Sequence, residues 1–153
     1  HQAIEVRDMF DGGDRDGAHA LAHSYGFNSA YSASSIIHHQ KLPETITYPV
    51  GAISIGSFGY AWAPHELFDT IGSALKSFSP YEMTFVCGYS NGSQGYLPTV
   101  KGFMHGGYES DSCNFLPGTG EKLTLALLDA LREIGEHDRT YYYKDRKIDW
   151  EKL

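Results

Sequence analysis

The chain has 153 residues, of which 41% are hydrophobic and 20% are charged, and its 12 Lys and Arg against 19 Asp and Glu give a formal net charge of −7. Residues 1–153 suit one domain or a fragment of one, and the composition excludes disorder of the whole chain. The negative charge without a basic cluster argues against a general nucleic-acid binder. Polar residues and glycines interrupt every apolar run before the roughly 18 residues that cross a bilayer, so we do not expect a transmembrane protein.

The N-terminal region carries little functional information. The chain begins His1-Gln2-Ala3 without a Met or a signal pattern, which we interpret as a mature product or a fragment. Residues 11–17 are polar and Gly-rich and predict a loop, although their spacing is not that of a calcium-binding loop. Cys87 and Cys113 are too few for a disulfide scaffold and leave the redox compartment undecided.

Periodicity predicts a mixed α/β order for the first half of the chain. Two helices are expected over residues 18–24 and 29–40, the second capped by Asn28 or Ser29. Residues 45–63 alternate large apolar side chains with small or polar ones, which predicts a pair of strands. The apolar spacing over residues 66–78 then indicates a helix.

The second half continues the pattern. Residues 83–89 form a short apolar run typical of a buried strand, which leads into the turn-forming residues 90–93. Residues 121–136 carry leucines at helical spacing. The tail, residues 137–153, mixes aromatic rings with charges of both signs, which favours packing against protein over stacking on bases. We therefore predict a central mixed β-sheet packed by helices.

Eight histidines raise the question of a metal site. His19 and His23 are four residues apart, so they share one face of the predicted helix, but the Glu of the zinc-protease pattern is absent. His38 and His39 point about 100° apart on a helix and cannot both bind one ion. We interpret both pairs as surface or packing residues.

Two segments at strand ends are better candidates for a site. Glu66 follows a predicted strand, where ligands collect in open α/β sheets, but it would serve equally well in complementing a helix dipole. The loop over residues 88–99 contains Asn91, Gln94 and Tyr96, which suit a polar substrate, and a tyrosine can also bind a metal as phenolate. A glycine-rich turn with packed tyrosines explains the same loop without a ligand.

Several short motifs in a fixed order resemble the neutral/alkaline non-lysosomal ceramidase family, in particular its bacterial members. The resemblance covers roughly residues 18–135. The motifs that carry it are residues 63–68, 84–92, 95–98, 106–109 and 117–121.

The resemblance implies a zinc-dependent amidase, in which two His, a Glu and a Tyr hold the metal and a Ser acts in hydrolysis of the ceramide amide. The family's Glu lies in a Pro-Gly-Glu-like turn, which here reads Pro64-His65-Glu66, and its Tyr lies five residues after an Asn, which leads from Asn91 to Tyr96. Glu66 and Tyr96 are thus the expected zinc ligands. His65, Asn91 and Gln94 are the expected substrate-binding residues.

The chain departs from the family pattern in two ways. His65 stands where many relatives have Gly, and the two zinc-binding His and the Ser belong to upstream motifs that this chain does not match. We therefore expect the C-terminal part of a larger catalytic domain, inactive alone, whose partner is the remainder of that domain on an upstream segment or a separate chain. The expected substrate is a lipid amide, and the resemblance suggests a secreted or periplasmic location.

Two rival interpretations remain. One is a related hydrolase of another amide or ester, because fold similarity does not fix the substrate. The other is a non-catalytic binding domain on the same scaffold.

The expected zinc site leads to three geometric expectations. Glu66 and Tyr96 share one cleft, the His65 ring turns toward solvent, and an apolar face is left exposed where the rest of the domain packs.

Overall fold

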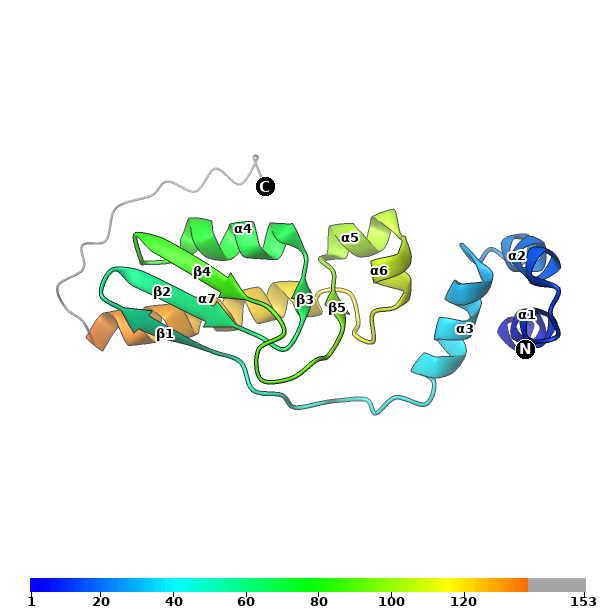
Figure 1. Cartoon of the computed structure of the whole chain (residues 1–153), viewed down its shortest axis with the longest axis horizontal. Coiled ribbons are helices and arrows are strands. Elements are labelled where there is room, and N and C mark those ends of the chain that lie inside the picture. The colour runs from blue at the N-terminus through cyan, green and yellow to red at the C-terminus, as the bar shows by residue number, and fades with distance from the viewer. Residues whose placement is uncertain (138–153) are drawn as a thin grey trace.

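The structure is a computed structural model that describes residues 1–137, and it has the predicted mixed α/β fold (Figure 1). A group of three N-terminal helices is joined by an extended segment to a small sheet with helices packed against it. The charged and aromatic tail predicted for the C-terminal end falls on residues 138–153, outside the described residues. Within residues 1–137, no helix is both long and apolar enough to span a bilayer.

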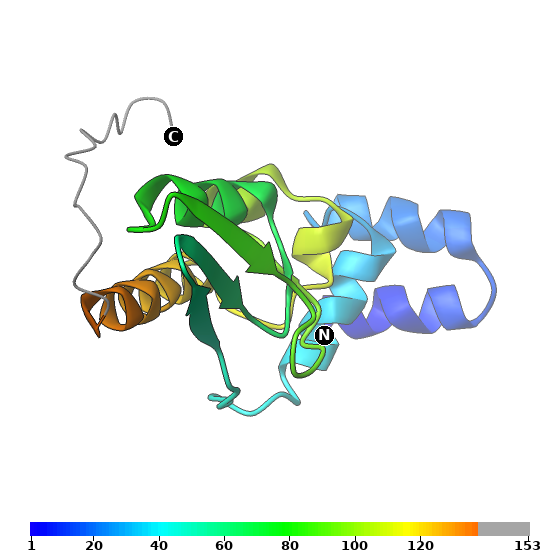
Figure 2. The same cartoon turned by 60° about the vertical axis from the view of Figure 1, so that its left-hand side comes forward.

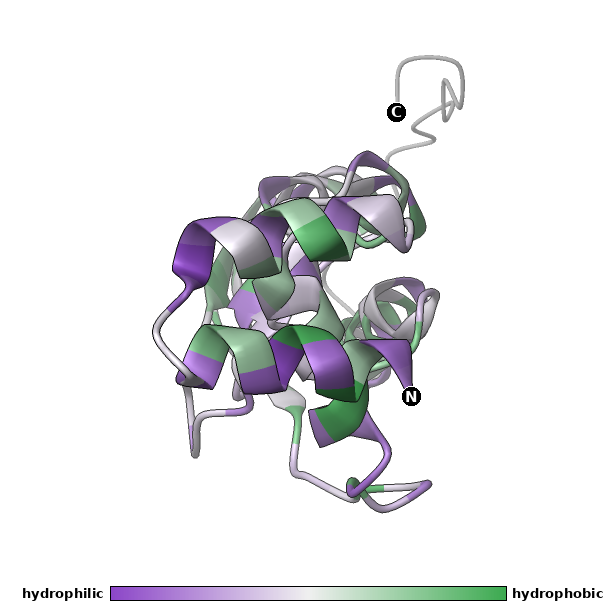
Figure 3. Ribbon diagram, turned by 90° about the vertical axis from the view of Figure 1, so that its right-hand side faces the viewer, coloured by the Kyte–Doolittle hydropathy of each residue, from purple (hydrophilic) through white to green (hydrophobic). Residues whose placement is uncertain are grey.

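The N-terminal helices are α1 (Gln2–Asp11), α2 (Arg15–Ser24) and α3 (Ala30–His39). Figure 3 shows the molecule from the side on which these helices lie. They pack through small buried side chains, which let the helices approach closely: Ala3, Val6, Ala18, Ala22, Ala30 and Ala33. The Ser29 hydroxyl caps α3 by accepting the Ser32 N–H at 3.1 Å, as predicted.

The predicted loop over residues 11–17 is wrong in extent. The Asp14 carboxylate accepts the Gly17 N–H at 2.9 Å, so this Asp is the N-cap of α2 and the helix begins at Arg15. The helix α1 was not predicted, because the sequence before the loop shows only a short apolar pattern.

The central sheet has three strands in the order β1 (Gly51–Ile55), β2 (Phe58–Trp62) and β4 (Met83–Cys87). The pair β1 and β2 is antiparallel, and β2 and β4 are parallel. The expected strand pair over residues 45–63 is thus confirmed, but its first strand begins only at Gly51.

Two helices, α4 (Asp69–Phe78) and α7 (Thr119–His137), cover one face of this sheet; α7 confirms the helix predicted over residues 121–136. Figure 2 shows the sheet in front and these helices behind it. The small residues of the strands face the helices: Gly59 lies so close that a Cβ atom there would be 2.7 Å from the Tyr81 ring and 3.0 Å from a Leu131 methyl group. The buried core of this part joins the sheet to both helices.

The large apolar residues of the strands face the other side. Because paired residues in a sheet project to the same face, the register places Ile53 with Tyr60 and Tyr60 with Phe85 on the face away from α4 and α7. Five large side chains on this face are exposed: Ile53, Ile55, Phe58, Met83 and Phe85. We call these five residues the outer apolar face. Their exposure confirms the expectation that the chain has an exposed apolar face.

A second, two-stranded parallel sheet lies beyond the carboxyl ends of β2 and β4 and consists of β3 (Glu66–Leu67) and β5 (Tyr96–Leu97). Two short helices follow β5, α5 (Val100–His105) and α6 (Tyr108–Asp111). The helix predicted to begin at residue 66 is therefore wrong at its start. Backbone bonds from the Glu66 N–H to Gly95 and from the Phe68 N–H to Leu97 hold this segment extended, and α4 begins only at Asp69.

Candidate functional site

The segment over residues 63–68 lies between two parts of the loop that follows β4. On one side, the Ala63 N–H donates to the Cys87 carbonyl at 3.1 Å and the Tyr89 N–H donates to the His65 carbonyl at 3.1 Å. On the other side, the Glu66 N–H donates to the Gly95 carbonyl at 3.0 Å. The loop is thereby fixed along the segment that contains Glu66.

Glycine is required at one position of this loop. A Cβ atom at Gly88 would lie 2.7 Å from the His65 carbonyl oxygen, too close for any side chain. The left-handed backbone conformations of the loop fall partly on other residue types, since Tyr89 has φ +49° and Asn91 has φ +59°. Such values are uncommon for residues with a side chain and mark a backbone that its surroundings constrain.

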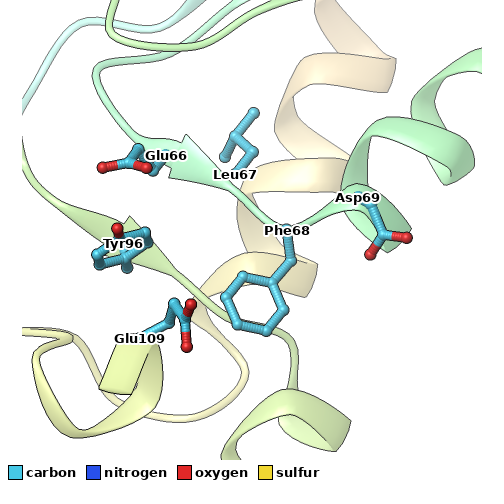
Figure 4. Close-up of a pocket in the computed structure, with 6 residues that line it drawn as sticks. All are labelled: Glu66, Leu67, Phe68, Asp69, Tyr96 and Glu109. Atoms are coloured by element: carbon cyan, nitrogen blue, oxygen red, sulfur yellow. The ribbon is translucent and has the colours of Figure 1, made fainter. Parts of the chain in front are cut away.

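Glu66 and Tyr96 are paired residues of the parallel strands β3 and β5, so their side chains project to the same face. Both line a cleft of about 370 Å³ (Figure 4). The expectation that the two side chains share one cleft is confirmed. The remaining lining comes from the start of α4 and from α6: Leu67, Phe68, Asp69 and Glu109.

A second cleft of about 560 Å³ adjoins the first and also contains Glu66. Tyr89 lines this second cleft, and its hydroxyl donates a short hydrogen bond to Glu66 Oε1. This bond is the main cause that raises the pKa of Tyr89 to about 12, because ionised tyrosine would lose the bond and face a carboxylate. Sequence reasoning assigned no role to Tyr89; the clue was its place just after β4, whose partner β2 leads into the segment that contains Glu66.

Tyr108 and Glu109 were also missed as members of this site. Gly106 and Gly107 have φ values of +69° and +110°, and this bend turns α6 back toward β5. The Tyr108 ring packs edge-on against the Tyr96 ring with centroids 5.8 Å apart, while Glu109 lines the first cleft. The Gly-Gly-Tyr-Glu motif at residues 106–109 was the signal that pointed to them.

The electrostatics of the first cleft suit a positively charged ligand. Its lining includes three carboxylates, from Glu66, Asp69 and Glu109, and no basic side chain. Burial, followed by the negative charge of Glu66, raises the pKa of Tyr96, so its phenol stays protonated near neutral pH.

Carboxylate and phenol oxygens are both ligands that zinc accepts once the phenol loses its proton, so Glu66 and Tyr96 fit the expected ligand roles chemically. Within residues 1–137, no group of three His, Cys, Asp or Glu is arranged to hold a metal ion. The described part of the chain therefore offers this carboxylate and phenol pair and no ready-made set of imidazole or thiolate ligands.

The expectation that His65 turns toward solvent is wrong. Residue 65 lies in a bend directly before β3, and the His65 ring is fully buried, with T-shaped contacts to Tyr48 and Phe115 whose ring centroids lie 4.9 and 5.0 Å away. Its Nδ1 lies 3.4 Å from the Gly95 carbonyl oxygen, and its Nε2 has no hydrogen-bond partner among the described residues. Burial lowers the pKa of His65, although the bond to Gly95 opposes this effect, and the ring is neutral near pH 7.

The other predicted substrate-binding residues lie apart from Glu66. Asn91 is exposed, and neither Asn91 nor Gln94 lines the two clefts that contain Glu66. Gln94 contributes through its backbone, since its N–H donates to the Pro64 carbonyl at 2.6 Å. A substrate role for His65, Asn91 and Gln94 stays a prediction.

Of the two histidine pairs in the N-terminal helices, His19 packs against its neighbours, whereas His23, His38 and His39 are exposed. His19 Nδ1 accepts the Ala30 N–H at 3.3 Å, and its ring packs edge-on against Phe10 and Tyr31. His38 and His39 lie at the end of α3 with ring centroids 6.1 Å apart.

Comparisons of the chain with protein-family models, with curated proteins and with solved structures found no match. The function is therefore argued from the site.

Proposed function

We propose that this chain is part of a zinc-dependent amide hydrolase that resembles neutral ceramidase, with Glu66 and Tyr96 as two of the metal's protein ligands. The observation that supports this most is the register of β3 and β5, which places a carboxylate and a phenol side by side in one cleft. Ligand atoms lie about 2 Å from zinc, so two of them must come within about 4 Å of each other. Paired residues on one face of a sheet allow this approach.

A zinc ion bound here would polarise the amide carbonyl and lower the pKa of its bound water. Glu66 would bind through its carboxylate. Tyr96 would have to release its proton, because its phenol is neutral without a metal, so zinc uptake would also release a proton to solvent. Asp69 and Glu109 would add negative charge that attracts the cation into the cleft.

Two oxygen ligands bind zinc weakly, so the proposal includes a partner, namely the remainder of the same catalytic domain. The outer apolar face supports this part of the proposal. A soluble domain rarely leaves several large apolar side chains together in water, and here Ile53 is 54% and Ile55 63% exposed. An upstream segment or a separate chain that covers this face would bring the further ligands and the Ser that the resemblance implies.

The lining of the first cleft favours a second candidate for the substrate. A lipid amide needs a long apolar groove, whereas this cleft holds about 370 Å³ and carries three carboxylates. A smaller amide, or one whose leaving amine is positively charged, suits these walls better. A series of N-acyl amides of increasing chain length, offered to the domain after reconstitution with its partner, distinguishes the two: rising kcat/KM with chain length supports the lipid amide.

The zinc site is tested by titrating the isotope-labelled chain with ZnCl₂ and following the backbone amide signals by NMR, which detects weak binding. We expect saturable shifts centred on Glu66 and Tyr96 in the wild-type chain, and none in Glu66→Gln or Tyr96→Phe. The matched control is Glu133→Gln, an exposed glutamate on α7, which should bind zinc like the wild type. Zinc shifts that persist in both site variants would disprove the assignment.

A further inference from the structure

Tyr89 stands out among the residues around the site because its hydroxyl contacts Glu66 directly. Its aromatic ring comes from the loop after β4, whereas Glu66 lies on β3 and Tyr96 on β5. Three separate segments thus converge on one carboxylate. A hydrogen bond to an ionised acceptor is stronger than a neutral one, and it restricts the rotation of the carboxyl group.

The backbone around Tyr89 is built to hold this contact. The Tyr89 N–H donates to the His65 carbonyl at 3.1 Å, and the next N–H, of Ser90, donates to the Ala63 carbonyl at 3.1 Å. Tyr89 itself has φ +49°, a conformation that a residue with an aromatic side chain seldom adopts. Such a residue persists only where its neighbours over-determine it, and residues of this kind gather at functional sites.

We propose that Tyr89 is a positioning residue for the Glu66 carboxylate, a role that rests on the zinc site proposed above. The hydrogen bond from Tyr89 engages Oε1, and a carboxylate has further acceptor sites, so Glu66 can accept this bond and bind a metal ion at the same time. Carboxylates that bind metals are themselves held by hydrogen bonds from neighbouring groups, which fix their orientation. Tyr89 supplies that bond and lines the second cleft, whereas Tyr96 lines the first.

The position of Tyr89 separates this role from that of a ligand. Tyr96 lines the same cleft as Glu66 and Glu109, whereas Tyr89 lines only the adjoining cleft of the two. A residue that contacts Glu66 without lining the cleft proposed for the metal is in the position of a residue that acts through Glu66.

The first arm of the experiment needs no metal. Urea unfolding of Tyr89→Phe, Glu66→Gln and the double variant gives a double-mutant cycle, in which we expect the unfolding equilibrium constants to show a coupling of about 3- to 10-fold between the two residues. The control cycle pairs Glu66→Gln with Tyr31→Phe in the N-terminal helices, and it should be additive. Phenylalanine keeps the ring, so the fold is retained. A coupling below about 2-fold would overturn the positioning role.

The second arm is the titration with ZnCl₂ described above. We expect Tyr89→Phe to weaken zinc binding by about 10- to 100-fold. Zinc binding that is unchanged in Tyr89→Phe overturns the role of Tyr89 alone. Zinc binding that is lost in Tyr89→Phe but kept in Tyr96→Phe makes Tyr89 a ligand and also overturns it. A wild-type chain that takes up no zinc, with the coupling to Glu66 intact, overturns the zinc function itself and with it the role of Tyr89 toward a metal.

Discussion

The buried His65 gives a prediction whose magnitude follows from its surroundings. The imidazole fills a space between Tyr48 and Phe115, and its Nε2 has no partner among the described residues. Two substitutions separate packing from polarity. His65→Ala leaves a cavity and should lower the free energy of unfolding by about 2–4 kcal/mol. His65→Phe keeps an aromatic ring and removes the unpartnered nitrogen. Removal of this nitrogen should raise the free energy of unfolding by about 1–3 kcal/mol, which offsets the cost of overpacking and of the lost weak bond to Gly95.

The same ring makes stability depend on pH. Burial lowers the pKa of His65 in the folded chain, while in the unfolded chain the pKa is near 6.5, so the unfolded chain binds more protons at acidic pH. Stability is unaffected above pH 6.5 and falls as the pH drops below it. If the folded ring takes up no proton, the loss at pH 5.5 is about 1.4 kcal/mol. Tyr48 does not offset this loss, because burial raises the pKa of its phenol and it stays neutral.

The assay is urea unfolding of the zinc-free chain, followed by circular dichroism at pH 7.5 and pH 5.5. The other histidines titrate in both proteins, so the informative quantity is the difference between wild type and His65→Phe. We expect His65→Phe to lose less than the wild type between the two pH values, by at most about 1.4 kcal/mol. Equal losses in both proteins would show that His65 is protonated in the folded chain and that its burial has been misjudged.

The remaining predictions concern packing and are checked by the same unfolding assay. Gly59→Val should lower the free energy of unfolding by about 1–3 kcal/mol, because even a Cβ atom there would lie 3.0 Å from a Leu131 methyl group. Gly72→Ala in α4 should raise the free energy of unfolding by up to about 1 kcal/mol, because its Cβ atom would meet nothing within 4 Å. Ile55→Ser on the outer apolar face should lower the free energy of unfolding by less than about 1 kcal/mol and reduce the binding of an apolar dye. If Ile55→Ser and Leu131→Ala, which truncates a buried residue, lower it equally, the exposure of that face is contradicted. Ser29→Ala should cost about 1 kcal/mol through the loss of the α3 cap.

Local sequence signals were sufficient where an element is stabilised by its own neighbours. The helix over residues 29–40 was predicted with Asn28 or Ser29 as its cap, because a capping side chain and an uninterrupted helical pattern are both local features, and the structure has Ser29 in this place. The last helix, α7, was predicted within two residues at its start and one at its end because its leucines repeat at helical spacing. Asp14 was treated as a loop residue since its capping bond could not be distinguished from ordinary loop polarity.

Longer-range pairing explains where prediction failed. Glu66 lies next to a helical pattern, but its backbone bonds with Gly95 on a distant loop, and this pairing makes the segment a strand. The same pairing reverses the expected direction of the His65 side chain. The candidate site followed this division: Glu66 and Tyr96 were named in advance as candidates, whereas Tyr89 was missed because its contact with Glu66 joins the loop after β4 to the strand β3.

The large and small residues of the central sheet lie on opposite faces. Gly59 and Ala61 face α4 and α7, where close approach of the helices leaves no room for larger side chains. The large side chains, which would each gain about 1.5–3 kcal/mol from full burial, instead lie on the outer apolar face. Exposure on this scale is costly for a domain that functions alone. Under the proposed function, a partner layer over this face would explain the alternation of the strands and would also supply the further ligands that a zinc ion at Glu66 and Tyr96 requires, so one partner would account for both features.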